Sequence, residues 1–361
     1  MIQTLSAAYG AAARWRRRWY AADPARRRRL RQPVISVGNL RVGGSGKTPI
    51  VAYIARLLVE QGERPAVLTR GYGRRTAAPG VTVVSDGASV GEGVATAGDE
   101  PLLLARELPG AAVLVCADRY LSGRLAETRL GATVHLLDDG FQHFALERDV
   151  DLLLVSEEDL TDTTLPGGRL REPISEGANA DAALVLAGYA SAAERIGRAF
   201  GVSPVFRVTR ALGVPRMVAE PGDSVVLPSA TRVFAVAGIA RPERFFADLT
   251  SVGWEVVGTM AFRDHHPFTR RDIARIAAAA RRAAAAIVLT TEKDAVRFAA
   301  CDLGDLPLAA VPLHVGIEPE EAFRDWLMTR LGAARTQHPG TLAPWHPGTL
   351  APWHLGTPSA E

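Results

Sequence analysis

A glycine-rich segment between an apolar run and an amphipathic run is the part of this chain most suited to chemistry. Residues 34–37 are rich in β-branched side chains and predict a buried strand, and residues 49–58 carry apolar side chains at helical spacing. The glycines between them permit positive φ, so consecutive backbone N–H groups can converge on phosphate oxygens at a helix N-terminus. Lys47 would contact the terminal phosphates of a nucleotide, and the Thr48 hydroxyl would hold Mg²⁺. The predicted nucleotide-binding residues are Arg41, Val42, Gly43, Gly44, Ser45, Gly46, Lys47 and Thr48.

The match to the pattern G-x-x-x-x-G-K-[ST] is incomplete, because Arg41 stands where the pattern has its first glycine. A glycine-rich turn with an exposed lysine is the alternative interpretation. The order of strand, glycines, Lys-Thr and helix favours a phosphate-binding turn.

Two carboxylates follow another predicted strand. Residues 133–137 form an apolar run that leads directly into Asp138 and Asp139. Ligands of doubly wound sheets bind at the carboxyl ends of the strands, so these carboxylates are well placed for Mg²⁺, directly or through water. An Asp-Asp-Gly turn without a chemical role is the alternative.

Asp99 stands immediately before a predicted helix at residues 101–108. An aspartate at this position can cap backbone N–H groups, and spacing alone does not separate capping from catalysis. As a general base, Asp99 would take the proton from an attacking hydroxyl, an effect typically worth about 10²–10⁴ in rate. His265 or His266, in a predicted loop, could orient Asp99 or raise its basicity, although two surface histidines would look the same in sequence.

Arginines stand beside glycines in two further segments, residues 69–74 and 167–173. Guanidinium groups next to glycines suit anionic ligands, although each segment could equally be a solvated turn. Residues 290–294 lack the Asn-Lys-x-Asp order that reads guanine, which argues against a GTPase. The candidate substrate-binding residues are Arg70, Arg74, Arg119, Gln142 and Arg171.

Composition indicates a soluble globular chain with room for two domains. The chain has 361 residues, of which 47% are hydrophobic and 22% charged, and no apolar run approaches the roughly 20 residues that span a bilayer. The net charge is only +3, although nine arginines fall within residues 14–31. We therefore expect no nucleic-acid partner, and no obligate protein partner is indicated. The two cysteines, Cys116 and Cys301, suggest neither a disulfide framework nor a zinc site and fit a reducing compartment.

The first 31 residues predict a basic amphipathic helix. Apolar side chains lie broadly on one side of it, and several arginines lie away from that side. Arginines are attracted to anionic lipid surfaces, and tryptophan suits the headgroup layer, so we expect contact with a membrane surface. A helix packed on the protein's own core and a transit peptide are the alternatives. The apolar side consists of Ile2, Leu5, Tyr9, Ala12, Trp15 and Trp19.

Strands and helices alternate after the glycine-rich turn, which predicts a doubly wound, mostly parallel sheet of the P-loop NTPase type. A turn-rich stretch at residues 220–231 precedes a second αβ pattern, so we expect a smaller α/β domain. The predicted units are the helix at 1–31, a nucleotide-binding domain at 32–225, and a C-terminal domain at 226–335. Residues 336–361 contain the repeat HPGTLAPW and are expected to be a disordered, low-complexity tail.

The chain resembles the tetraacyldisaccharide 4'-kinase family over roughly residues 1–330. The resemblance implies transfer of the ATP γ-phosphoryl group to the 4'-hydroxyl of a tetraacyl glucosamine disaccharide 1-phosphate, in lipid A biosynthesis at the cytoplasmic face of the bacterial inner membrane. A P-loop kinase of a soluble sugar or nucleoside is the alternative. The strings that carry the resemblance are SVGNLRVGGSGKTP, LTRGYGR, GDEP, LLDDGFQH, LPGGRLREP, AGIARPERFF, FRDHHPF and TTEKDAVR.

The resemblance also implies roles for individual residues. Lys47 and Thr48 match the residues that serve nucleotide and Mg²⁺, and Asp99 matches the presumed base. Its partner is a histidine of the DHH string, assigned to His265 with His266 in reserve. The implied metal-side carboxylates are Asp139 and Glu172, with Asp138 and Gln142 close by.

Overall fold

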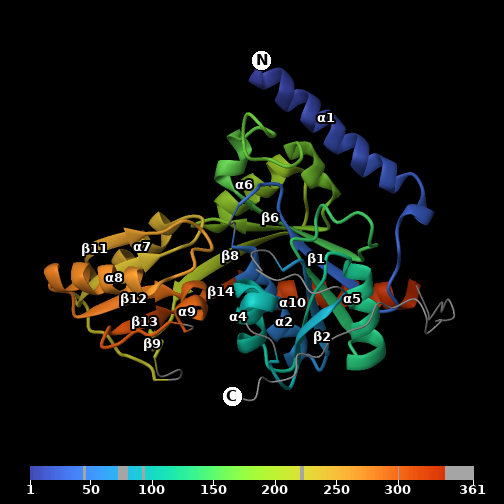
Figure 1. Ribbon diagram of the computed structural model, residues 1–361. Coiled ribbons are helices and arrows are strands. Elements are labelled where there is room, and N and C mark those ends of the chain that lie inside the picture. The colour runs from blue at the N-terminus through green and yellow to red at the C-terminus, as the bar shows by residue number, and fades with distance from the viewer. Residues whose placement is uncertain (44–45, 72–79, 92–93, 220–222, 300, 338–361) are drawn as a thin grey trace.

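The structure is a computed structural model that describes residues 1–43, 46–71, 80–91, 94–219, 223–299 and 301–337 (Figure 1). The predicted site residues Gly44, Ser45 and Arg74 lie outside these ranges, as does nearly all of the predicted tail. The chain forms two sheets that lie side by side, each covered by helices, and an N-terminal helix that extends along one side of the larger unit.

The larger sheet has nine strands in the order β14-β8-β7-β6-β1-β5-β2-β4-β3. Every pairing from β8 to β4 is parallel, and the two outer strands pair antiparallel. The inner strands are apolar and buried along their whole length, as expected for parallel strands covered on both faces. The strands are β1 (Val34–Gly38), β2 (Pro65–Thr69), β3 (Thr82–Asp86), β4 (Ala112–Val115), β5 (Val134–Asp138), β6 (Val150–Ser156), β7 (Ala182–Leu186), β8 (Val205–Leu212) and β14 (Leu313–Glu318).

Helices cover both faces of this sheet, which confirms the predicted doubly wound α/β class. One face packs against α2 (Lys47–Glu60), α4 (Asp99–Glu107) and α10 (Glu320–Gln337). The other face packs against α5 (Arg119–Leu125) and α6 (Ala190–Phe200). Because successive strand residues point to opposite faces, neighbouring residues of one strand enter different cores, as Val34 and Ile35 do.

The smaller sheet has five strands in the order β11-β10-β12-β13-β9. Its core is formed with three helices, and the first of them follows β10 as in other βαβ units. The elements are β9 (Arg216–Met217), β10 (Arg232–Ala237), α7 (Pro242–Ser251), β11 (Glu255–Ala261), α8 (Arg270–Arg282), β12 (Ile287–Thr291), α9 (Glu292–Phe298) and β13 (Leu308–Val311).

The end of the chain returns to the larger sheet, which differs from the predicted C-terminal domain at 226–335. Strand β14 pairs with β8, and α10 buries Phe323, Leu327 and Leu331 in the core of the larger sheet. These three side chains recur every four residues and so form one helix face. The smaller unit therefore spans β9 to β13, and residues 313–337 belong to the larger one.

Helix α1 (Ile2–Ala21) holds to the larger unit by a few polar contacts. The Thr164 hydroxyl donates to the Ser6 carbonyl at 2.6 Å, and the Gly167 N–H donates to the Ser6 hydroxyl at 2.9 Å. Nearer the end of the helix, the Arg17 guanidinium is buried. The side of α1 that carries Leu5 and Trp15 is exposed and does not pack on the protein's own core, although Ile2 lies close to Gly167. None of the helices in the described ranges is long and apolar enough to cross a membrane.

Two glutamates at the junction of α4 and α9 should make the free energy of unfolding depend on pH. Burial and the charge of Glu292 raise the pKa of Glu107 to about 7, and burial also raises the pKa of Glu292. The folded protein thus binds a proton here that the unfolded chain releases near its ordinary pKa of about 4.3, so stability falls as pH rises from about 4.5 to about 7. We expect Glu107→Gln to raise the urea midpoint at pH 8 but not at pH 4.5.

The matched control is Glu60→Gln, which changes an exposed glutamate of α2. Its urea midpoint should follow that of the unsubstituted protein at both pH values. A Glu107→Gln midpoint that falls at pH 8 would contradict the assignment of a shared proton to this pair.

Candidate active site

The phosphate-binding turn and the two aspartates meet because β1 and β5 are adjacent and parallel, with Val37 opposite Asp138. Gly38 ends β1, and a Cβ there would lie 2.5 Å from the Phe141 Cβ, so only glycine lets the loop after β5 pack this closely. Gly46 has φ +82° and caps α2, which begins at Lys47. The turn therefore delivers Lys47 to the carboxyl end of β5.

Lys47 lies between an amide and a carboxylate. Its Nζ donates to Asn39 Oδ1 at 2.9 Å and lies 3.2 Å from Asp139 Oδ1. Asn39 is a site residue that the sequence analysis missed. Its position directly after β1 was the available signal, because ligands bind at that edge of the sheet. The Nδ2 atom of Asn39 is buried and has no hydrogen-bond partner among the described residues, so it is a donor available to an anion.

Asp139 is held as a carboxylate. Arg171 Nη1 donates to both of its oxygens at 2.9 Å. Burial opposes ionisation, but the charges of Lys47 and Arg171 outweigh it and hold the pKa of Asp139 below its ordinary value. Arg171 also donates to Gln142 Oε1 at 3.1 Å, so the predicted residues Gln142 and Arg171 lie beside the predicted Lys47 and Asp139.

Asp138 has the opposite electrostatic environment. It ends β5 and is buried, and burial together with the charge of Glu100 raises its pKa to about 7. Arg119, which begins α5, is also buried and lies close enough for its charge to favour the Asp138 carboxylate. Burial and the nearby charge of Arg70 lower the pKa of Arg119. Arg119 thus lies within electrostatic range of both Arg70 and Asp138. A cation bound beside Asp138 would ionise that carboxyl group.

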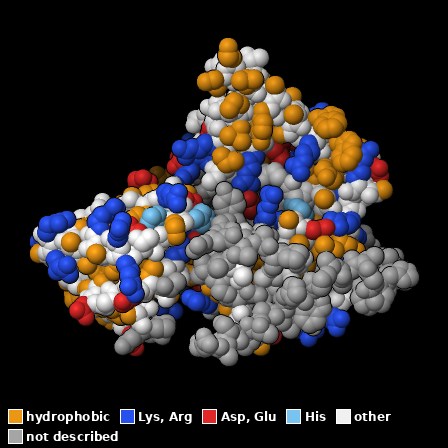
Figure 2. All heavy atoms as spheres, in the orientation of Figure 1, with side chains coloured by type: hydrophobic (Ala, Val, Ile, Leu, Met, Phe, Trp, Pro, Cys, Tyr) orange, Lys and Arg blue, Asp and Glu red, His pale blue; other side chains and the backbone are white. Residues whose placement is uncertain are grey.

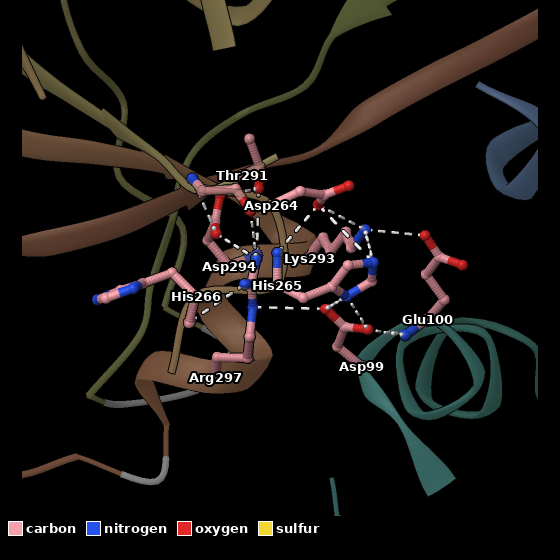
Figure 3. A network of polar contacts seen from close by, with 10 residues as sticks. Asp99, Glu100, Asp264, His265, His266, Thr291, Lys293, Asp294 and Arg297 are labelled. Atoms are coloured by element: carbon pink, nitrogen blue, oxygen red, sulfur yellow. Dashed lines mark hydrogen bonds and ion pairs between the residues drawn. The ribbon is translucent and has the colours of Figure 1, made fainter. Parts of the chain in front are cut away.

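Asp99 is the first residue of α4, and only 3% of its surface is exposed. His265 Nδ1, from the smaller unit, lies 2.9 Å from Asp99 Oδ2 and 3.1 Å from Oδ1 (Figure 3). Burial opposes ionisation, but the His265 hydrogen bond and the charge of Lys293 lead the interactions that lower the pKa of Asp99. The N-cap of α4 is Gly98, which has no side chain to cap the helix, and Asp99 Oδ1 accepts the Glu100 N–H at 3.0 Å within the first turn. Asp99 therefore contacts a backbone N–H of α4 as well as His265.

The two histidines of the DHH string point to different partners. His265 has φ +58°, and this turn of the backbone directs its ring toward Asp99. His266 Nε2 lies 3.0 Å from Asp272 Oδ2, and its ring stacks on Phe262. The structure therefore brings His265, and not His266, to Asp99.

Two further side chains of the network were missed by the sequence analysis. Lys293 in α9 donates to Glu100 Oε1 at 2.9 Å, and Arg297 Nε lies 3.4 Å from Asp99 Oδ2. Both belong to the TTEKDAVR string, at the carboxyl end of β12, where a polar helix start was visible in the sequence. Their reach across to α4 was not visible, because it depends on how the two units pack.

Two predicted site residues have other partners. The Arg41 guanidinium donates to Glu158 at 2.6 Å and to Asp162 at 3.1 Å. Arg17 Nη2 donates to the buried Glu172 at 2.6 Å. We therefore do not include the Arg41 side chain among the proposed nucleotide-binding residues or Glu172 among the proposed metal ligands.

The remaining oxygen donors fit Mg²⁺. No group of three or more His, Cys, Asp and Glu side chains forms a preassembled metal cage in the described part of the chain. Mg²⁺ does not need one, because it is usually bound by one or two carboxylates, water and substrate phosphates. The carboxylates of Asp138 and Asp139 and the hydroxyl of Thr48 are hard oxygen ligands of this kind.

Comparisons with known proteins agree with this geometry. The family model described as "Tetraacyldisaccharide-1-P 4'-kinase" matches residues 1–332. A "Tetraacyldisaccharide 4'-kinase" of Geobacter metallireducens is 42% identical over 82% of this chain and 88% of its own length, and one of Anaeromyxobacter sp. is 43% identical over 84% and 82%. The crystal structure of the "apo" form of LpxK from Aquifex aeolicus in complex with ATP has a TM-score of 0.72 and 31% identity, and the match covers 91% of this chain and 98% of that one. The chain therefore belongs to the tetraacyldisaccharide 4'-kinase family.

Proposed function

We propose that Asp99 is the general base of this kinase and that His265 orients it. The family transfers a phosphoryl group to the 4'-hydroxyl of a tetraacyl disaccharide 1-phosphate, a step of lipid A biosynthesis. Such a hydroxyl must lose its proton as it attacks phosphorus, and a buried carboxylate held ionised can accept that proton. The observation that carries the proposal is the 2.9 Å contact between His265 Nδ1 and Asp99 Oδ2.

The nucleotide in this proposal is ATP, as in the Aquifex aeolicus complex. Lys47 contacts its terminal phosphates, and the unpaired Nδ2 donor of Asn39 supplies a further contact to an anion. Thr48, Asp138 and Asp139 would hold Mg²⁺, which when bound would neutralise charge on the phosphates and help to orient them. Glu100 influences Asp138 through its charge and stands next to Asp99, which supports one continuous site for base and phosphates.

The side chains that we propose to face the substrates lie close to the carboxylates Asp138 and Asp139 or to each other. Arg119 lies near Asp138 and Arg70, and Arg171 lies beside Gln142. We assign these three arginines, together with the Gln142 amide, to the anionic groups of the two substrates. Phosphoryl transfer requires mainly positioning and charge neutralisation from the protein, and these side chains supply both.

Helix α1 is proposed to dock on the cytoplasmic face of the inner membrane, where an acylated acceptor is held. Figure 2 shows hydrophobic side chains gathered along this helix, with Lys and Arg side chains beside them. Trp15 is 67% exposed and Ile2 is 62% exposed, although both would favour an apolar or interfacial environment. The basic residues of the first 31 add attraction to anionic lipid.

Vesicle flotation tests the docking proposal. With vesicles of phosphatidylethanolamine and phosphatidylglycerol, we expect the protein to float and the variant Leu5→Ser/Trp15→Ser to bind about tenfold more weakly or worse, since burying each side chain contributes roughly 1.5–3 kcal/mol. The control is Val226→Ser, which removes an exposed apolar side chain of the smaller unit. Equal flotation of all three proteins would contradict docking through α1.

A further inference from the structure

Lys293 occupies the first turn of α9 and reaches from the smaller unit to three polar atoms around Asp99 (Figure 3). Its Nζ lies 2.9 Å from Glu100 Oε1, 3.3 Å from Asp264 Oδ1 and 3.3 Å from His265 Nε2. The ammonium group therefore meets the nitrogen of the His265 ring that does not face Asp99. Nothing in the proposed chemistry requires a cation on this far side of the histidine.

The hydrogen-bond donors of Lys293 determine which ring nitrogen of His265 can carry the proton. An ammonium group has three donors and no acceptor, so the ring nitrogen that faces it must accept. A neutral imidazole with an accepting Nε2 carries its proton on Nδ1. Nδ1 is the atom that faces both oxygens of Asp99, at 2.9 and 3.1 Å, and it can donate to them only in this tautomer.

The opposite tautomer would place two acceptors against each other. With the proton on Nε2, the lone pair of Nδ1 would face the Asp99 carboxylate, and Nε2–H would face the Lys293 ammonium. Both contacts would be repulsive, so the ring would have to turn or Asp99 would have to take a proton. A protonated Asp99 could not act as a base.

Lys293 is held in place and kept charged. Thr291 caps the start of α9, since its hydroxyl accepts from the Asp294 N–H at 3.1 Å. Asp294 is buried and accepts the Gly238 N–H at 3.1 Å, which ties α9 to the end of β10. Burial lowers the pKa of Lys293, but the charges of Glu100 and Asp99 outweigh it and raise the pKa above its ordinary value.

We propose that Lys293 is a positioning residue that fixes His265 in its Nδ1–H tautomer. The inference rests on the proposed role of Asp99 and deepens it. Through this contact α9 of the smaller unit selects the form of the histidine that keeps Asp99 unprotonated and correctly oriented. Lys293 itself touches neither the hydroxyl nor the phosphates in this account.

The tautomer is measured directly by ¹⁵N NMR of the histidine rings in the full-length protein at pH 8. The His265 signals are identified by their loss in His265→Asn. We expect a protonated, pyrrole-type Nδ1 and an unprotonated, pyridine-type Nε2. In Lys293→Met, which keeps the length of the side chain but has no donor, we expect the fraction of the Nδ1–H form to fall and kcat to fall about 10–100-fold, the usual effect of losing a partner behind a functional histidine.

Two controls separate tautomer selection from a general role in joining the units. Lys293→Arg has only donors, so it should retain the Nδ1–H form. Arg241→Met removes another ion pair between the units, with Glu158 at 3.1 Å, and should leave the His265 tautomer unchanged. A loosened interface alone would instead alter the His265 signals in both Met variants.

The results distinguish failure of this inference from failure of the proposed function. An unchanged Nδ1–H pattern in Lys293→Met, or an Nε2–H pattern in the unsubstituted protein, would overturn the inference. A changed tautomer with undiminished kcat would support tautomer selection by Lys293 and would overturn Asp99 as the base.

Discussion

Asp99→Asn is expected to lower kcat by about 10²–10⁴-fold, the usual contribution of a general base. The amide is nearly the same size as the carboxylate and can still accept the hydrogen bond from His265 Nδ1, so the contact between the two units can persist. It cannot take the proton of the 4'-hydroxyl. The measurement is transfer of labelled phosphate from ATP to the tetraacyl disaccharide 1-phosphate in detergent micelles.

The matched control for this substitution is Asp272→Asn. Asp272 is also a carboxylate beside a histidine, but it contacts His266 and caps α8. We expect its kcat to stay within about threefold of the unsubstituted protein, because surface polar changes away from the chemistry have small effects. ATP affinity should be unchanged in Asp99→Asn. Near-normal turnover by a folded Asp99→Asn protein would remove Asp99 from the mechanism.

Lys47→Ala is expected to lower kcat/KM by at least about 10²–10³-fold, the cost of losing one preorganised donor to developing charge. The substitution removes the cation that lies 3.2 Å from Asp139 and that we place at the terminal phosphates. It should weaken ATP binding as well, because phosphate contacts exist before and during the transfer. Isothermal titration with ATP and Mg²⁺ and the same turnover assay measure the two effects.

Arg56→Ala is the control for Lys47→Ala, because it removes another cation of α2 on the exposed part of the helix. Arg56 lies 3.7 Å from Glu107 and also interacts with the charge of Glu292, and neither glutamate is placed at the phosphates, so ATP affinity and turnover should be close to those of the unsubstituted protein. If Lys47→Ala bound ATP and turned over as well as Arg56→Ala, the glycine-rich turn would not be the phosphate site.

The sequence predicted the inner strands well and the outer strands poorly. Strands such as β1 and β2 are buried on both faces, so they are continuous apolar runs with clear ends. Strand β8 alternates between buried and partly exposed residues before it becomes exposed, and most residues of β14 are at least partly exposed. The place of β8 and β14 in the sheet depends on their pairing with each other, although they lie far apart in the chain. The local pattern of apolar and polar residues does not indicate such pairing.

The same limit applies to the site. The residues expected at the carboxyl ends of β1 and β5 do meet, because adjacent parallel strands bring their ends together. His265 and His266 could not be separated by sequence, since the backbone at His265, with φ +58°, and the packing of the two units place the His265 ring at Asp99. Glu172 was named as a metal-side carboxylate from the family resemblance, and its contact with Arg17, which stands 155 residues earlier in the chain, was not visible in the sequence. Asn39 stands directly after β1, which was a signal in the sequence, whereas the reach of Lys293 to α4 depends on how the two units pack.

Asp99 and His265, which come from two separate units, are proposed to act as one base. A double-mutant cycle of Asp99→Asn and His265→Asn in the labelled-phosphate assay tests this claim most directly, because residues that act together have non-additive effects. We predict that the double variant has the kcat of Asp99→Asn alone, within about threefold. A double variant slowed by the product of the two single effects would contradict the claim.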